Sequence, residues 1–150
     1  RRLTREENTM NPSQIKLVQD SFAKVAPISE QAAVIFYDRL FEVAPSVKAM
    51  FPTDMTEQRK KLMATLAVVV NGLSHLESIL PAASALAIRH VGYGARPEHY
   101  PVVGGALLWT LEKGLGAAWT PEVAAAWTAA YGTLSSFMIS EAYGKKQAAE

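Results

Sequence analysis

"ILPAASALAIRHVGYGARPEHYP" (residues 79–101) joins an alanine-rich apolar segment to a break rich in glycine and proline. Pro81 suits the first turn of a helix, where the backbone N–H has no partner to lose. Ala83, Leu86 and His90 are three and four residues apart, so they share one face of that helix. Gly92 and Gly94 are typical of its end. The segment therefore predicts an apolar helix that carries a histidine on its inner face.

The rest of the chain repeats the same spacing of three and four in its apolar positions, and no segment shows sustained alternation of period two. Breaks fall at proline and glycine, and Asn11, Thr56 and Thr120 are expected to cap helices. An all-α fold of six or seven helices packed as one unit is predicted. The expected helices cover residues 12–27, 29–45, 56–72, 79–94, 97–114 and 120–143, with a short helical turn at 45–51.

The composition fits one globular domain. The chain has 150 residues, of which 49% are hydrophobic and 19% charged, and its net charge is +1. A chain of this length buries about two-thirds of its unfolded surface, and its charge favours neither disorder nor nucleic-acid binding. It has no cysteine, which excludes disulfides, zinc–thiolate sites, iron–sulfur clusters and thiol-linked haem.

The N-terminal segment 1–9 is polar and charged, and it is followed by Met10. We expect 1–9 to be a flexible extension, native or artificial, and 10–150 to form the domain. No apolar run approaches the roughly 20 residues of a membrane span, and no secretion signal is visible. The expected location is the cytoplasm, with no membrane or nucleic-acid partner.

Motifs for phosphate loops, serine hydrolases, zinc proteases and calcium loops are absent from the sequence. The basic run "RKK" (59–61) has two interpretations. It is a solvated helix face, or its cations meet the carboxylates of a ligand bound beside the apolar helix.

The three histidines differ in setting. His75 follows a predicted helix end and is expected at the surface. His99 follows Pro97 at a helix start, where a hydrogen bond to the helix terminus is the simple interpretation. His90 lies on an apolar stripe, so it is either a buried histidine with partners on its ring nitrogens or a metal ligand.

Two further polar side chains fall on apolar helix faces. Tyr37 lies on the inner face of the second expected helix, and Gln58 lies one turn before Leu62. Together with His90 they indicate a cavity with a metal-ligating wall and an opposite wall of two hydrogen-bond donors. An empty void of that size would be costly.

Four blocks of this sequence resemble the bacterial single-domain haemoglobins, the haem domain of flavohaemoglobins and the globins of methanotrophs. "FYDRLFEVAPSVKAMF" (36–51) resembles the family pattern F-Y-x-x-L-F-x-x-x-P-x-x-x-x-x-F, and "ILPAASALAIRH" (79–90) resembles its proximal helix. "HYPVVGGALL" (99–108) and "AAWTAAYG" (125–132) are similar to its last two helices. The resemblance covers 12–143 and implies a globin fold around a non-covalent haem b.

The resemblance implies roles for single residues. His90 would be the proximal iron ligand, and Tyr37 and Gln58 would form the distal pair that holds bound oxygen, with slow oxygen release as the consequence. The other haem contacts that it implies are Phe51, Leu62 over the iron, Tyr100, Val103, Lys61 and His99.

Reversible oxygen binding is the first functional interpretation, with carbon monoxide and nitric oxide as further ligands and a monomer or weak homodimer as the expected state. Nitric oxide dioxygenation with a separate reductase is the alternative, because the same pocket serves both activities. Gas sensing, or a haem-less globin module that binds a partner, is the third interpretation.

Two departures from the resembled proteins limit what is carried over. Those proteins have a proximal glutamate at the position of Ala142, whereas here Glu141 lies one residue earlier and about 100° around the helix. No flavin or nicotinamide segment follows the globin pattern in these 150 residues, so we expect reduction of the iron to depend on a partner.

Overall fold

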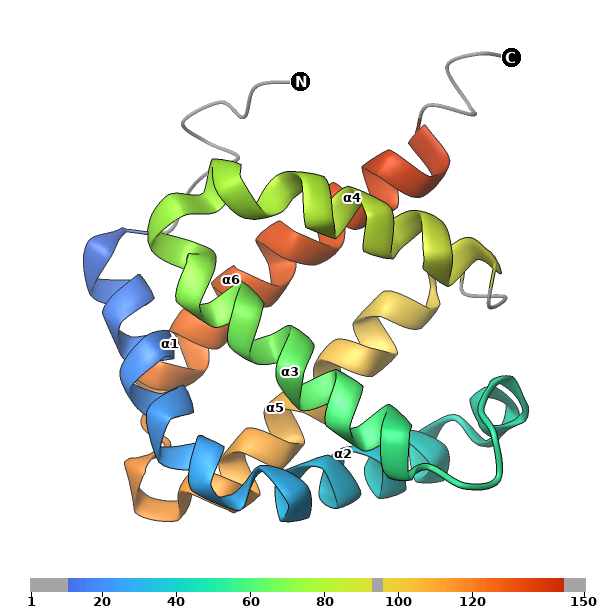
Figure 1. Cartoon of the computed structure of the whole chain (residues 1–150). Helices are drawn as coiled ribbons and strands as arrows, with labels where there is room; N and C mark the ends of the chain where they lie inside the picture. Colours follow the sequence, from blue (N-terminus) through green and yellow to red (C-terminus); the bar gives the residue numbers. More distant parts are fainter. Residues whose placement is uncertain (1–10, 93–95, 145–150) are drawn as a thin grey trace.

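The computed structural model describes residues 11–92 and 96–144, and these residues form helices and no strand. The prediction of an all-α fold is therefore confirmed. The extension expected at residues 1–9 and the helix end expected at Gly94 lie outside the described residues, so the division of the chain stays a prediction. The α-helices are α1 (Pro12–Val25), α2 (Ser29–Val43), α3 (Thr56–Gly72), α4 (Leu76–Gly92), α5 (His99–Leu115) and α6 (Pro121–Ile139) (Figure 1).

Short helical segments connect or extend these helices. Four are 3₁₀ turns, and a π-helical turn continues α6. The turn at Pro45–Met50 confirms the expected helical turn in that region. The segments are Ala26–Ile28, Pro45–Met50, Leu73–His75, Gly116–Ala118 and the π-turn Ser140–Gly144.

Two of the three expected caps are confirmed. The Asn11 side chain accepts the backbone N–H of Gln14 at 2.8 Å, and Thr120 accepts that of Val123 at 3.2 Å. The expected cap at Thr56 is wrong, because Asp54 takes that role. Its carboxylate accepts both the backbone N–H and the hydroxyl of Thr56, and these hydrogen bonds lower the pKa of Asp54. A charged acceptor at a helix N-terminus is favoured over a hydroxyl by the helix dipole.

The start of α4 also differs from the prediction. The helix begins at Leu76, so Pro81 lies inside it rather than in its first turn. The carbonyl that loses its hydrogen bond is that of Glu77, an exposed residue. Ile79 packs closely on Gly72 of α3, and this packing favours a continuous helix through the proline.

The start of α5 is shifted in the opposite direction. Pro97 and Glu98 form a turn, and the helix begins at His99. The carbonyl of Pro97 accepts the N–H of Tyr100 at 3.2 Å, so the proline leads into the helix instead of opening it.

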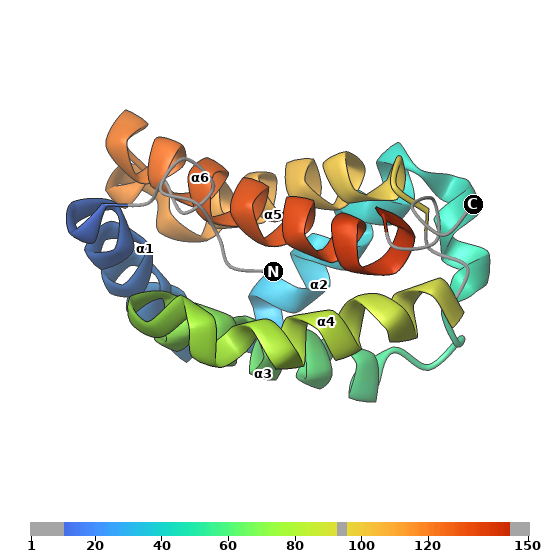
Figure 2. The ribbon, with the colours of Figure 1, turned by 90° about the horizontal axis from the view of Figure 1, so that it is seen from above.

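The helices form two layers. Figure 2 shows α3 and α4 along one side of the molecule and α5 and α6 along the other, with α1 closing one end. The most extensive packing joins α2 to α5 and α1 to α6, and α3 packs on α1, α2 and α4. Within the described ranges, no helix has both the length and the apolar character needed to cross a membrane.

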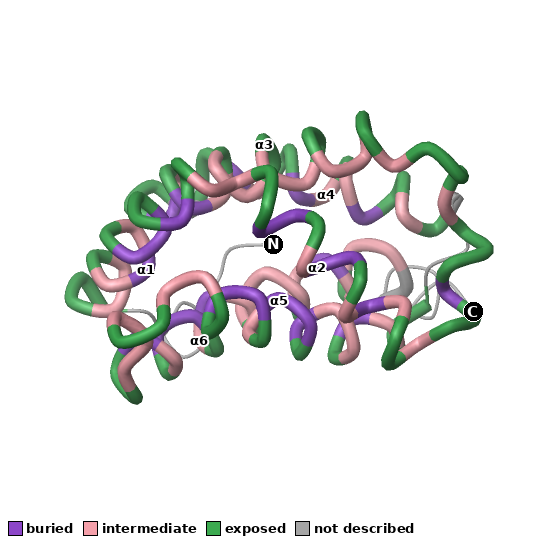
Figure 3. Tube along the Cα trace, turned by 90° about the horizontal axis from the view of Figure 1, so that it is seen from below, coloured by how far each residue is buried: buried purple, intermediate pink, exposed green. Residues whose placement is uncertain are grey.

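The described core is divided into two clusters. The larger one fills the space among α1, α2, α5 and α6 and includes Phe36, Tyr37 and Trp127. The smaller one joins Ala83 and Ala87 of α4 to Tyr100 and Met138. Among its described residues α3 buries only Val70, and Figure 3 shows this helix almost entirely in the intermediate and exposed colours. The apolar face of α3 is thus only partly covered by the rest of the described chain.

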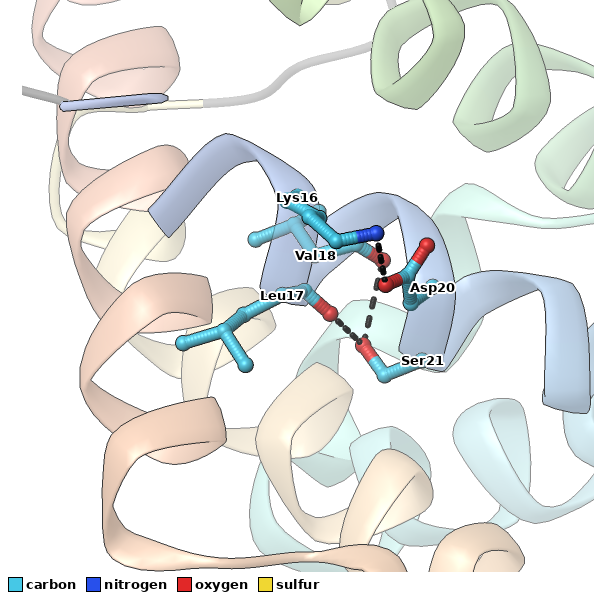
Figure 4. Close-up of polar contacts among 5 residues, drawn as sticks. All are labelled: Lys16, Leu17, Val18, Asp20 and Ser21. Carbon is cyan, nitrogen blue, oxygen red and sulfur yellow. Dashed lines mark hydrogen bonds and ion pairs between the residues drawn. The ribbon is translucent and has the colours of Figure 1, made fainter. Parts of the chain in front are cut away.

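A buried hydrogen bond joins α1 to α6. The indole N–H of Trp127 donates to the Ser21 hydroxyl at 2.8 Å, and both side chains are buried. Ser21 in turn donates to the carbonyls of Leu17 and Val18 on its own helix, while the Lys16–Asp20 ion pair lies on the exposed surface (Figure 4). The hydroxyl therefore satisfies polar groups on both helices.

Replacing Ser21 by Ala leaves the Trp127 N–H buried without an acceptor. We expect the free energy of unfolding to fall by about 1–3 kcal/mol, the usual cost of an unsatisfied buried donor. Urea denaturation measures this change. Ser135→Ala is the matched control, because the Ser135 side chain is only half-buried and its exposed hydroxyl bonds a carbonyl of its own helix, and it should change stability by less than about 0.5 kcal/mol. Equal losses in the two variants would contradict the assignment.

Candidate functional site

Tyr37 is held in an aromatic cluster at the inner face of α2. Its ring meets Phe36 and Phe51 edge to face at centroid distances of 4.9 and 5.5 Å, and Phe41 lies at 5.9 Å. The side chain is 5% exposed. Because rings on several sides limit rotation, the phenol oxygen is presented in one direction.

The structure brings Tyr37 and Gln58 together. The Gln58 amide Nε2 donates to the Tyr37 hydroxyl oxygen at 3.2 Å. An amide nitrogen only donates, so the phenol acts as acceptor here and keeps its own proton for a second partner. Burial raises the pKa of Tyr37, and the hydrogen bond from Gln58 opposes this rise less strongly. The phenol is therefore neutral and able to donate at physiological pH.

His90 is half-buried near the C-terminal end of α4. Its Nδ1 lies 2.8 Å from the backbone oxygen of Leu86, one turn earlier. A carbonyl oxygen only accepts, so Nδ1 carries the hydrogen, and the neutral imidazole has its lone pair on Nε2. This tautomer is the one that a metal-ligating histidine uses when a backbone carbonyl orients its ring.

The apolar candidates for the site belong to both core clusters. Phe51, Leu62 and Val103 are half-buried and pack against the larger core cluster, whereas Tyr100 is buried in the smaller one. The expected contacts therefore come from both parts of the divided core. Leu62 on α3 and Val103 on α5 are thus only partly covered by the described residues.

The structure gives less support for the charged and polar candidates as members of this site. Lys61 is exposed. His99 accepts the backbone N–H of Arg96 on Nδ1 at 3.0 Å, which is the hydrogen bond at a helix terminus that its position predicts. Contacts of Lys61 and His99 with a cofactor stay predictions.

Glu141 takes part in a contact that links α4 to the end of α6. The Ser84 hydroxyl donates to its Oε1 at 2.8 Å, and Glu141 belongs to the π-turn that follows α6. Ala142 packs against the smaller core cluster. The carboxylate at this end of the chain thus anchors α4 through Ser84, six residues before His90.

Sequence reasoning did not identify three residues that shape this site. Phe41 lies one turn after Tyr37 on the same face, so its spacing could have predicted its place in the aromatic cluster. The contacts of Ser84 and Tyr131 could not be predicted from spacing, because their partners are distant in sequence. Ser84 bonds Glu141, and the Tyr131 hydroxyl donates to the Tyr100 carbonyl.

Comparison with known proteins gives consistent matches. The globin family model matches residues 34–138. A flavohemoprotein of Rhodopirellula baltica is 34% identical over 128 residues, covering 83% of this chain and 31% of the relative. A flavohemoprotein of Bacillus subtilis is 31% identical over 131 residues, covering 83% and 32%. The chain therefore spans about a third of the length of these relatives.

Solved structures agree. A bacterial globin from Campylobacter jejuni matches with a TM-score of 0.80 and 28% identity, covering 93% of this chain and 100% of that one. An engineered carbene transferase from Rhodothermus marinus, otherwise described as a candidate nitric oxide dioxygenase, matches with a TM-score of 0.82, 23% identity and coverage of 94% and 99%. At that identity the second match speaks for the fold alone.

Proposed function

Because the chain belongs to the globin family, we propose that it binds haem b without a covalent link and that its function is reversible oxygen binding. The observation that carries this proposal is the hydrogen bond from Gln58 to the buried Tyr37 phenol. It leaves a neutral O–H donor in an apolar setting. His90 is the proposed ligand of the iron.

The described residues fit such a group. The described core forms two clusters, and apolar side chains of α3 and α5 that pack against the larger one are only half-buried, among them Leu62, Leu66 and Val103. A flat apolar macrocycle would cover them, and burial of apolar surface is worth about 25 cal/mol per Å². The Leu86 carbonyl holds the hydrogen of His90 on Nδ1, and in this tautomer a histidine would ligate a metal through Nε2.

Haem, when bound, would supply an iron that can take a diatomic gas. His90 would hold the iron, and the Leu86 carbonyl fixes the plane of its imidazole. The aromatic cluster around Tyr37 restricts the phenol to one orientation. The His90 imidazole and the Tyr37 phenol are thus both oriented before a ligand binds.

Tyr37 is the proposed direct donor to the gas. Gln58 donates to the phenol oxygen, and a phenol that accepts one hydrogen bond becomes a better donor of another. Gln58 therefore acts through Tyr37. Such a donor favours oxygen over carbon monoxide, because an oxygen ligand carries more negative charge.

The oxygen dissociation rate should not depend on pH between about 7 and 9. Burial raises the pKa of Tyr37 above its ordinary value of 10.0, so in this range the phenol keeps the proton that it donates. Only above the raised pKa should the rate increase, as the donor is lost. Stopped-flow measurement across this range tests the expectation, and a rate that rises steadily from pH 7 would contradict it.

Nitric oxide dioxygenation is the second proposed activity, supported by the similarity to flavohemoproteins. One nitric oxide and one oxygen molecule combine with one electron to give nitrate. A reductase would supply that electron. Sustained consumption of nitric oxide with nitrate formation, in the presence of a reductase, would support this activity, and a single turnover alone would argue against it.

Gas titration tests oxygen binding itself. The chain is loaded with haemin and reduced, and its absorption spectrum is recorded under argon, oxygen and carbon monoxide. We expect distinct spectra for the three gases and return to the argon spectrum when oxygen is removed. Immediate and irreversible oxidation under oxygen would contradict reversible binding.

A further inference from the structure

The segment 51–58 contacts Tyr37 at both of its ends. The Phe51 ring meets the Tyr37 ring edge to face at a centroid distance of 5.5 Å, and the Gln58 amide nitrogen donates to the Tyr37 hydroxyl at 3.2 Å. Phe51 directly follows the turn Pro45–Met50, whereas Gln58 belongs to the first turn of α3. The position of Gln58 therefore depends on how the residues between them enter α3.

Asp54 fixes the start of α3. Its Oδ1 accepts the backbone N–H of Thr56 at 3.0 Å and the hydroxyl of the same residue at 2.7 Å. The backbone N–H of Arg59 donates to the carbonyl of Met55 at 2.9 Å. These three hydrogen bonds enclose the turn that contains Gln58, and the carboxylate supplies two of them.

The first turn of a helix depends on such a cap, because its first N–H groups have no acceptor inside the helix. Gln58 is the third residue of α3, so its own backbone N–H is among them. Glu57 and Lys60 form an ion pair at 3.7 Å on this turn, but both side chains are exposed and an exposed pair contributes little to stability. The Asp54 cap is therefore the stronger of these two interactions.

We propose that Asp54 positions Gln58 for its hydrogen bond with Tyr37, which makes this exposed carboxylate a positioning residue for oxygen binding. Without the cap, the first turn of α3 frays, and the Gln58 amide is away from the phenol for part of the time. The consequence for oxygen rests on the proposed function, whereas the contact between Gln58 and Tyr37 does not. The competing interpretation is an ordinary cap that stabilises α3 without influence on Gln58.

Three variants of the turn separate these interpretations. Asp54→Ala removes the acceptor, and Asp54→Asn keeps one without the charge, because Asn caps helices about as well as Asp. Glu57→Ala is the matched control. It removes the same charge from the same turn, but the Glu57 carboxylate forms the ion pair with Lys60. Asp54→Ala and Glu57→Ala are each also combined with Gln58→Leu.

Amide hydrogen exchange in the whole chain, before haemin is added, measures the turn itself. The usual contribution of a capping side chain corresponds to about 2- to 30-fold in the equilibrium between the formed and the frayed turn. We expect exchange in 59–62 to be faster by such a factor in Asp54→Ala. Exchange in Asp54→Asn and Glu57→Ala should stay close to that of the wild-type chain.

Urea denaturation of the same chain, again before haemin is added, measures whether Asp54 and Gln58 act together. If Asp54 positions Gln58, then Asp54→Ala already weakens the bond to Tyr37, and Gln58→Leu has less left to remove. The loss of stability in the combined variant should therefore be smaller than the sum of the two single losses. The losses of Glu57→Ala and Gln58→Leu should simply add.

The oxygen dissociation rate of the haem-loaded chain gives the functional readout. Asp54→Ala should raise this rate, by no more than the factor that Gln58→Leu causes, because the effect passes through Gln58. In the Gln58→Leu background Asp54→Ala should cause no further change. Asp54→Asn should restore the wild-type rate.

Additive losses of stability for Asp54→Ala and Gln58→Leu would overturn the positioning role, even if exchange in 59–62 is faster. An oxygen rate that Asp54→Ala leaves unchanged, or raises equally with and without Gln58, would overturn it as well. So would equal effects of Asp54→Asn and Asp54→Ala, because charge alone would then be responsible. If the wild-type chain does not bind oxygen reversibly, the proposed function fails instead, and the stability measurements alone decide the role of Asp54.

Discussion

Replacing Tyr37 by Phe raises the oxygen dissociation rate by about tenfold or more. The change removes the hydroxyl and keeps the ring, so the aromatic contacts with Phe36, Phe41 and Phe51 persist. A hydrogen bond to a charged group contributes about 1.5–3 kcal/mol, and 1.4 kcal/mol corresponds to a factor of ten in rate. Flash photolysis or ligand replacement in a stopped-flow instrument measures the rate.

The dissociation rate of carbon monoxide from the same variant is an internal control. Carbon monoxide carries less charge as a ligand, so its dissociation rate should change far less than that of oxygen. Gln58→Leu should raise the oxygen rate less than Tyr37→Phe, because Gln58 donates to the phenol and acts through it. Equal effects on both gases, or a larger effect at Gln58, would contradict the assignment of Tyr37 as the direct donor.

Replacing His90 by Ala abolishes the Soret band of the haem-loaded protein. Loss of a group that merely supports a metal ligand weakens metal binding by about 10- to 100-fold, and loss of the ligand itself should exceed this. Imidazole added to the variant should restore the band, because it replaces the missing side chain. Haemin titration followed by absorption spectroscopy measures both effects.

His75→Ala is the control for this experiment. His75 is exposed and lies in the 3₁₀ turn before α4, so its removal should leave the haem spectrum unchanged. A normal spectrum in His90→Ala without imidazole would show that another residue holds the iron.

The helices were predictable because their signals are local. Asn11 and Thr120 cap their helices as expected, and apolar residues three and four apart reach the core. The predictions at Thr56 and Pro81 were wrong for different reasons: a competing hydrogen-bond acceptor at Thr56, and packing between helices near Pro81. Asp54 is the stronger acceptor next to Thr56, and α4 begins at Leu76, ahead of its proline, in the part of the helix where Ile79 packs on Gly72.

The site was only partly predictable. The bond between His90 and Leu86 follows from a spacing of four on one helix. The hydrogen bond between Tyr37 and Gln58 spans two helices, and periodicity shows only that each side chain faces inward. Contacts such as Ser84–Glu141 and Tyr131–Tyr100 depend on how distant helices cross. No pattern within a single helix specifies them.

Titration of the chain with haemin tests haem binding most directly. Absorbance at the Soret maximum, corrected for free haemin, should rise to a sharp break at one haem per chain, and reduction should give the spectrum of a ferrous haem ligated by one histidine. A spectrum that remains that of free haemin, with no break at any ratio, would contradict haem binding and with it the proposed roles of His90, Tyr37 and Gln58.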